Sequence, residues 1–129
     1  MTGDLLDTSI LIAPDPGALA QLPEAAAISV VTIGELHAGV LLARDDPARA
    51  ARRTRLDAVR AAFAPLPVDE PVAERYGQVL AMARSKRRAA KATDLLVIAT
   101  AAAHGRTLHT RDMRQAALAR DAGVPVRSL

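Results

Sequence analysis

The stretch ATDLLVIATAAAHGRTLHTRD, residues 92–112, decides the fold of this 129-residue chain. It carries one acid near its start, Asp94, and then a very apolar segment of helical length that ends at Gly105, the residue type most common just after a helix. Thr107–His109 then indicates a strand, which is followed by Asp112. Because a helix that leads directly into a strand is half of a βαβ unit, this stretch predicts a parallel sheet.

The same alternation of strands and helices extends to both sides of this stretch. Further short strands are expected at Leu5–Leu6, Ile28–Val31, Leu66–Val68 and Val124–Val126. Helical segments are expected at Thr8–Ala13, Thr32–Ala43, Pro47 to about Phe63, Glu70–Arg88 and Met113–Ala122. This order predicts an α/β three-layer sandwich, with a four- to five-stranded parallel sheet and helices on both faces. Since no linker or repeat interrupts it, we expect residues 1–129 to form a single domain.

The composition restricts the chemistry that the chain can perform. It has no cysteine, which excludes disulfides, thiolate metal sites and thiol nucleophiles. A net charge of +3 favours an anionic partner such as nucleic acid, although GC-rich codon usage, which favours Arg over Lys, explains the charge nearly as well. No apolar run is long enough to cross a membrane, and Asp4 and Asp7 stand where a signal peptide would be basic. We therefore expect a cytoplasmic protein with no membrane contact.

Four acids occupy equivalent positions in the alternation. Asp7 ends the first strand, Glu35 lies in the first turn of the helix after the second, Asp94 opens the apolar helix, and Asp112 follows the fourth strand. Ligands of open parallel sheets bind beyond the carboxyl ends of the strands, where these acids would meet. Two carboxylates about 4 Å apart repel by about 4 kcal/mol, so the group would need a cation. Mg²⁺ or Mn²⁺ suits oxygen ligands and activates water for phosphodiester hydrolysis.

Helix capping explains each acid separately. Thr32 to Glu35 fits the S/T-x-x-E capping box, Thr93 can cap a helix that has Asp94 in its first turn, and the other two acids each precede a helical turn. Amides cap as well as acids but bring no negative charge. If the acids bind a metal ion, the fold survives and the activity is lost in Asp7→Asn, Glu35→Gln, Asp94→Asn and Asp112→Asn.

Four segments resemble, in order, the acidic motifs of PIN-domain ribonucleases: LLDTSIL (5–11), VVTIGEL (30–36), ATDLLVIATAAAHG (92–105) and LHTRD (108–112). They are most similar to the motifs of VapC toxins, which belong to type II toxin–antitoxin pairs. The resemblance covers nearly the whole chain and implies a PIN-like fold and an endoribonuclease that depends on Mg²⁺ or Mn²⁺. It implies that the catalytic and metal-binding residues are Asp7, Glu35, Asp94 and Asp112.

The resemblance also implies supporting residues and partners. Ser9 and Thr110 would support the metal, a water or a phosphate, while turn and cap bonding explains their hydroxyls equally well. VapC-like toxins are usually homodimers, inhibited by a VapB-like antitoxin whose tail lies near the acids. The helical pair within Thr32–Phe63 offers a groove for that tail, or its apolar residues simply pack in the core.

The chain departs from the family around its last acid. Many VapC toxins carry Asn at the position of Asp112 and an acid three residues later, where this chain has Gln115. That difference leaves open whether one or two metal ions bind. The segment before Asp94 is unusually basic, so we expect Arg87, Arg88 and Lys91 to bind RNA phosphates. A solvated helix end with cations near its C-terminus explains the same run.

The remaining residues favour few other functions. Phe63 and Tyr76 are the only aromatics and fit core positions, so no stacking platform for bases is expected. The three histidines are scattered and are expected to be surface or structural residues, and His109, which lies close to Asp112 in sequence, is the one to test as a general base. A phosphate-receiver domain would need a lysine after its last strand, which is absent. A non-catalytic PIN-like module that binds RNA or a partner stays the main alternative.

Overall fold

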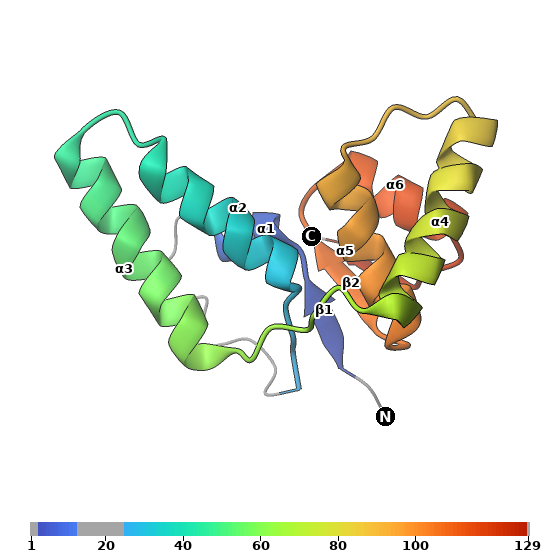
Figure 1. Ribbon diagram of the computed structural model, residues 1–129, viewed down its shortest axis with the longest axis horizontal. Coiled ribbons are helices and arrows are strands. Elements are labelled where there is room, and N and C mark those ends of the chain that lie inside the picture. The colour runs from blue at the N-terminus through green and yellow to red at the C-terminus, as the bar shows by residue number, and fades with distance from the viewer. Residues whose placement is uncertain (1–2, 13–24, 129) are drawn as a thin grey trace.

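The computed structural model describes residues 3–12 and 25–128, and Figure 1 shows their arrangement. In chain order the elements are β1 (Asp4–Leu6), α1 (Thr8–Leu11), α2 (Val30–Leu41), α3 (Asp46–Ala62), α4 (Glu70–Ser85), α5 (Ala92–Ala103), β2 (Thr107–Thr110), α6 (Met113–Asp121) and β3 (Val126–Ser128). The expected turn at Thr8–Ala13 is α1, and Ala13 lies outside the described residues. Among the described residues, none of the helices is both long and apolar enough to span a membrane.

The sheet is parallel, with the order β1-β2-β3. Leu5 of β1 pairs with Leu108 of β2, which pairs with Val126 of β3. Two isolated parallel bridges extend the sheet beyond β1, from Leu5 to Ala27 and from Ser29 to Leu66. All five expected strand positions therefore lie side by side, and the predicted parallel topology is confirmed with three regular strands.

Two of the predicted strands shrink to single bridges for a local reason. The β-branched run Ile28–Val31 was expected to be a strand, but α2 begins at Val30. The side-chain hydroxyl of Ser29 accepts a hydrogen bond from the backbone N–H of Val31 at 3.0 Å, which caps the helix. The cap starts the helix two residues earlier than expected and leaves room only for the bridge between Ser29 and Leu66.

Helices cover both faces of the sheet, as expected for three layers. Successive strand residues point to opposite faces, so Leu5 packs in one core and Leu6 in the other. The core around Leu5 includes residues of α4, α5 and α6, whereas the core around Leu6 includes residues of α1, α2 and α3. Figure 1 shows the two groups of helices on either side of β1 and β2. Phe63 and Tyr76 pack against these cores, as predicted.

Helix ends set the loops that lead into the next element of the chain. Gly105 and Gly123 follow α5 and α6 with positive φ angles of 61° and 79°, as the sequence predicted. Arg87 follows α4 with a φ of 54°, although it is not a glycine. The helix expected over Glu70–Arg88 therefore ends at Ser85, and residues 88–91 run as an exposed segment to the start of α5.

Candidate active site

Asp7 lies directly after β1 and is the most buried of the four motif acids, at 7% exposure. Its backbone N–H donates to the carbonyl of His109 at 2.9 Å, which continues the pairing of β1 with β2. Ser9 Oγ and Thr110 Oγ1 donate to the same carboxylate oxygen, Oδ2, at 2.7 and 2.9 Å. Two charge-assisted hydrogen bonds therefore hold this carboxylate in one orientation.

The two hydroxyls also connect Asp7 to the loop after β2. Ser9 Oγ accepts from the backbone N–H of Arg111 at 2.9 Å, and Thr110 Oγ1 accepts from that of Asp112 at 3.0 Å. The hydroxyls lie 3.2 Å apart. The two interpretations of these hydroxyls are therefore compatible: Thr110 makes a hydrogen bond within the turn, and both hydroxyls also contact a motif acid.

Glu35 reaches the same region from α2. Thr8 Oγ1 donates to its Oε1 at 2.8 Å and also lies 3.4 Å from Thr32 Oγ1. Thr8 begins α1, so the residue after Asp7 positions the second acid. No local pattern in the sequence indicates this role of Thr8, although the residue stands inside the LLDTSIL motif.

Asp94 and Asp112 face each other across the starts of α5 and α6. Gln115 joins the two helices: its Nε2 donates to the backbone carbonyl of Asp94 at 3.0 Å, and its backbone N–H donates to Asp112 Oδ1 at 3.2 Å. Asp112 Oδ1 also accepts from the backbone N–H of Arg114 at 2.9 Å. Gln115 is almost fully buried at 3% exposure, so it fixes the spacing of these two acids.

The charges show that the four acids converge. Burial raises the pKa of the Asp94 carboxyl above its ordinary value, and the negative charges of Asp7, Glu35 and Asp112 raise it further. The positive charge of Lys91 acts in the opposite direction. Each of the other three acids is therefore close enough to act on Asp94, although Asp112 is 18 positions and Asp7 is 87 positions away from it along the chain.

Capping accounts for only one of these acids. Asp112 is the N-cap of α6 and accepts two backbone hydrogen bonds. Asp7 stands at the N-cap of α1 but makes no capping bond with its side chain. The two specific capping predictions are wrong: Ser29 caps α2, so Thr32 and Glu35 lie inside that helix, with Glu35 beyond its first turn.

Lys91, rather than Thr93, is the N-cap residue of α5, and its side chain makes no capping bond. Asp94 does lie in the first turn of α5, as expected. Three of the four carboxylates are thus left without a capping role, which favours the metal-binding interpretation.

The chemistry of the side chains fits a hard divalent ion. Carboxylate oxygens are the ligands that Mg²⁺ and Mn²⁺ prefer, and a cation would offset the repulsion that raises the pKa of Asp94. Within residues 3–12 and 25–128, no three His, Asp or Glu side chains already form a metal-holding cluster. Like-charged carboxylates gain from closing together only when the charge of an ion offsets their repulsion.

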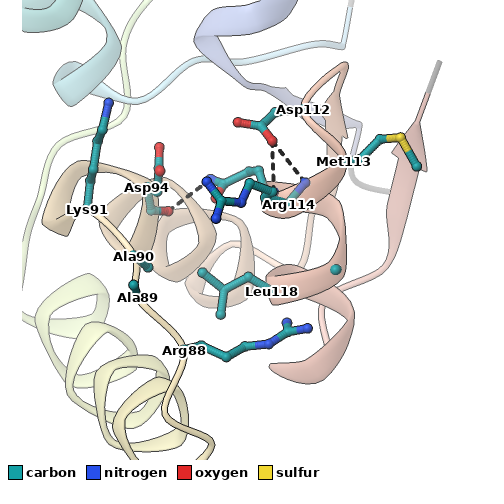
Figure 2. A pocket seen from close by; sticks show the side chains of 11 residues that line it. Arg88, Ala89, Ala90, Lys91, Asp94, Asp112, Met113, Arg114 and Leu118 are labelled. Carbon is teal, nitrogen blue, oxygen red and sulfur yellow. Dashed lines mark hydrogen bonds between the residues drawn. The ribbon is translucent and has the colours of Figure 1, made fainter.

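A groove of about 800 Å³ opens beside Asp94 and Asp112 (Figure 2). Arg88 and Lys91 line it, as the phosphate-binding prediction requires, but Arg87 does not. Arg88 is also paired with Asp121 at 2.6 Å. Arg114 lines the groove as well, although it was not among the predicted phosphate contacts, because no local sequence pattern indicates that α6 lies beside residues 88–91.

A second groove of about 460 Å³ lies at Glu35, between α2 and α3. Its lining includes Ile12, Leu36, Gly39, Arg52 and Arg55. The helical pair thus forms a groove and also contributes side chains to the core. Val40 and Leu56 are fully buried in the core with Leu36, whereas Leu41 is 63% exposed.

His109 does not join the acids. It is buried in β2, and its Nδ1 lies 3.8 Å from Asp4 Oδ2. Burial lowers the pKa of its imidazole, although the charge of Asp4 acts against that shift. Since its ring faces Asp4, the geometry favours a structural role over that of a general base.

Comparison with known proteins gives one family. A model of the PIN domain matches residues 5–121. Ribonuclease VapC8 of Mycobacterium tuberculosis is 45% identical over 100 residues, which cover 75% of this chain and 88% of VapC8. Ribonuclease VapC5 of the same organism is 36% identical over 126 residues, which cover 95% of this chain and 92% of VapC5.

Solved structures agree with the sequence matches. The crystal structure of VapBC-5 from Mycobacterium tuberculosis, a toxin–antitoxin system, superimposes with a TM-score of 0.82 at 32% identity and covers 100% of this chain and 98% of that chain. FitAcB from Neisseria gonorrhoeae gives a TM-score of 0.76 at 32% identity and covers 95% of this chain and 94% of that chain. The likeness extends over the whole fold, including the elements that carry the four acids.

Proposed function

Because this chain belongs to the PIN-domain family, among its VapC-type toxins, we propose that it is a metal-dependent endoribonuclease that hydrolyses phosphodiester bonds in RNA. One observation supports this function most. Burial and the negative charges of Asp7, Glu35 and Asp112 raise the pKa of Asp94, so the other three carboxylates lie close enough to act on it. A site of that charge and oxygen chemistry is suited to Mg²⁺ or Mn²⁺.

The four acids would hold the ion, and other residues would hold the acids. When bound, the ion would supply an activated water and offset the negative charge that develops on the phosphoryl group. Ser9 and Thr110 orient Asp7 through its Oδ2, and Thr8 orients Glu35 through its Oε1. These hydrogen bonds fix the side chains before RNA arrives, which lowers the reorganisation needed during the reaction.

The test is cleavage of total cellular RNA by the purified chain in Mg²⁺, Mn²⁺ or EDTA, with the new RNA ends mapped by sequencing. We expect cuts with either ion and none with EDTA. Each of four amide variants should lose at least about 10³-fold in rate, because each removes a ligand charge: Asp7→Asn, Glu35→Gln, Asp94→Asn and Asp112→Asn. The matched control is Asp57→Asn, which changes an exposed acid of α3.

Two outcomes would contradict this function. Amide variants that cut at the rate of the unchanged chain would show that the acids are not the active site. A folded chain that binds RNA but cuts none with either ion would instead be the non-catalytic module that the sequence left open. Growth arrest on expression, which is lost in Asp7→Asn, would link the cleavage to toxicity in the cytoplasm.

We extend the proposal to the partners, a second copy of the chain and a VapB-like antitoxin. VapBC-5 is described as a toxin–antitoxin system, and the match with it extends over the full length of this chain. The groove at Glu35 suits a peptide tail, because Ile12 and Leu36 offer apolar contact and Glu35 offers a charge. Gly39 borders this groove, and a Cβ there would meet open space.

Gly39→Phe is therefore a sharp test of the inhibited state. The bulky side chain should fill the groove, so co-expression of the VapB-like antitoxin should no longer restore growth in cells that the variant still arrests when it is expressed alone. Gly77→Phe is the control, since Gly77 lies on α4 and its Cβ would also meet open space. Rescue of Gly39→Phe that equals rescue of the control would exclude this groove. Gel filtration or light scattering checks the dimer.

A further inference from the structure

The groove beside Asp94 and Asp112 has two chemically different parts. Figure 2 shows the two acids and Lys91 toward one end and Arg88 at the other, with Ala89, Ala90 and Leu118 between them. The middle part is thus apolar, while both ends are charged. Its volume of about 800 Å³ lies within the range of roughly 300–1,000 Å³ that is usual for small-molecule sites.

The cations at the acidic end are available to a ligand. Within the described part of the chain, neither Lys91 nor Arg114 forms an ion pair, whereas Arg88 pairs with Asp121 at 2.6 Å. Lys91 precedes α5 and Arg114 stands at the start of α6, so they approach the acids from the two walls of the groove. A phosphate next to the acids would meet two positive charges there.

We propose that this groove holds one unpaired nucleotide adjacent to the cleaved bond, with its phosphate at Lys91 and Arg114 and its base against Ala89, Ala90 and Leu118. The assignment rests on the proposed ribonuclease function, which places the cleaved phosphate at the acids. A base within a duplex is stacked and paired, so its faces cannot lie against the apolar part of the groove. The groove therefore selects for RNA that is single-stranded on this side of the cut.

The apolar part is built from small aliphatic side chains, which has a consequence for selectivity. Alanine and leucine give van der Waals contact to any base face but offer no hydrogen bonds to its edge. Most of the affinity would then come from the phosphate contacts, and it would fall as salt concentration rises. Base identity would matter less at this position than the absence of pairing.

The experiment measures binding without cleavage, in the Asp7→Asn background. The probe is a fluorescein-labelled RNA of about 12 nucleotides with no self-pairing, used alone or annealed to its complement, and anisotropy gives the Kd. Ala90→Leu narrows the apolar part, and Arg114→Gln removes one cation. The controls are Ala61→Leu on α3 and Arg120→Gln on α6, which are exposed and lie outside the lining of the groove.

We expect the single strand to bind at least about tenfold more tightly than the duplex, and Ala90→Leu to remove most of that difference. Arg114→Gln should weaken single-strand binding roughly three- to tenfold and lower the salt slope by about 0.7. Both controls should stay within about twofold of the Asp7→Asn background. Since Ala90 is exposed in the segment between α4 and α5, its substitution is not expected to disturb folding, and Ala89→Leu serves as a second variant.

Equal affinities for single strand and duplex, or groove variants that bind like their controls, would overturn the assignment. That result is distinct from failure of the proposed function, because cleavage is not the readout. If the unchanged chain cuts no RNA but Asp7→Asn shows the expected binding pattern, the proposed ribonuclease function is wrong and the nucleotide-binding groove is supported. If cleavage depends on the acids as expected but the groove variants bind RNA like their controls, the ribonuclease function is supported and the nucleotide-binding groove is wrong.

Discussion

The two halves of the acidic site are held in different ways. At the strand ends, the Asp7 carboxylate accepts two hydroxyl hydrogen bonds and is buried. At the helix starts, Asp94 has no described side-chain hydrogen bond, and burial and three neighbouring charges raise its pKa. The strand half is therefore positioned by local bonds, while the helix half carries unfavourable charge that a cation would relieve.

The largest expected loss of stability comes from breaking the strand half. Thr110→Val keeps the side-chain shape but removes the donor to Asp7 and the acceptor for the backbone N–H of Asp112. We expect cleavage to fall about 100-fold and the free energy of unfolding to fall by about 2 kcal/mol, since buried groups lose their partners. Rates and urea unfolding measure this, with Thr54→Val on exposed α3 as the control. Normal activity in Thr110→Val would show that the strand half needs no hydroxyl.

The opposite change in stability is expected when the helix half is altered. Asp94→Asn should lose cleavage yet gain about 0.5 kcal/mol of folding stability at pH 7 without divalent ions, because the cost of burying the charge and the repulsion are removed, and solvent screens both at this partly exposed carboxyl. The raised pKa sets the pH dependence. The protonated Asp94 carboxyl contributes stability that is fully present below its ordinary pKa of 3.8. This stability is lost as the pH rises through the raised pKa of the folded state. The two proteins should therefore converge in stability below about pH 4, and a variant that is less stable than the unchanged chain at pH 7 would contradict the charge argument.

Metal addition sharpens the same comparison. Mg²⁺ or Mn²⁺ at about ten times its Kd should raise the free energy of unfolding of the unchanged chain by about 1.4 kcal/mol, and EDTA should reverse the gain. Asp94→Asn should show little or no gain, because it lacks a ligand charge. Thermal melts with both proteins, together with titration calorimetry, measure this. An equal gain in both would place the ion elsewhere.

The smallest effect tests a residue outside both halves. Arg87 follows α4 with a left-handed φ of 54°, a conformation that costs a non-glycine residue about 1 kcal/mol. Arg87→Gly should therefore stabilise the fold by about 0.5–1 kcal/mol. Because Arg87 does not line the groove, RNA affinity should change little. A clear loss of affinity would instead support the original prediction that Arg87 binds phosphate.

The sequence predicted the topology and the four acids because both follow from order along the chain. Each strand could be found from a short apolar run, and each acid from its place after a strand or at the start of a helix. Capping was harder to predict, because Ser29 and Thr32 are both good N-cap residues and only packing decides where α2 begins. Contacts between distant elements, such as Thr8 with Glu35, leave no local pattern.

Arg114 shows the same limit on the groove side. Its position after Asp112 indicated only a helix start, and its contribution to the groove depends on how α6 packs against residues 88–91. Arg88 was predicted as a phosphate contact, yet its pairing with Asp121 depends on that packing too. Three assignments stay predictions: the catalytic and metal-binding roles of the four acids, the RNA-binding roles of Arg87, Arg88 and Lys91, and the single domain over residues 1–129.

The hydrogen bond between Thr110 and Asp7 joins residues that are 103 positions apart. A ribosome that adds about 5–20 residues per second needs roughly 5–20 seconds to make the intervening chain. Until Thr110 has emerged, the carboxylate of Asp7 lacks one of its two hydroxyl partners. A polypeptide released before this point would lack both Thr110 and Asp112, so the strand half of the acidic site would stay incomplete.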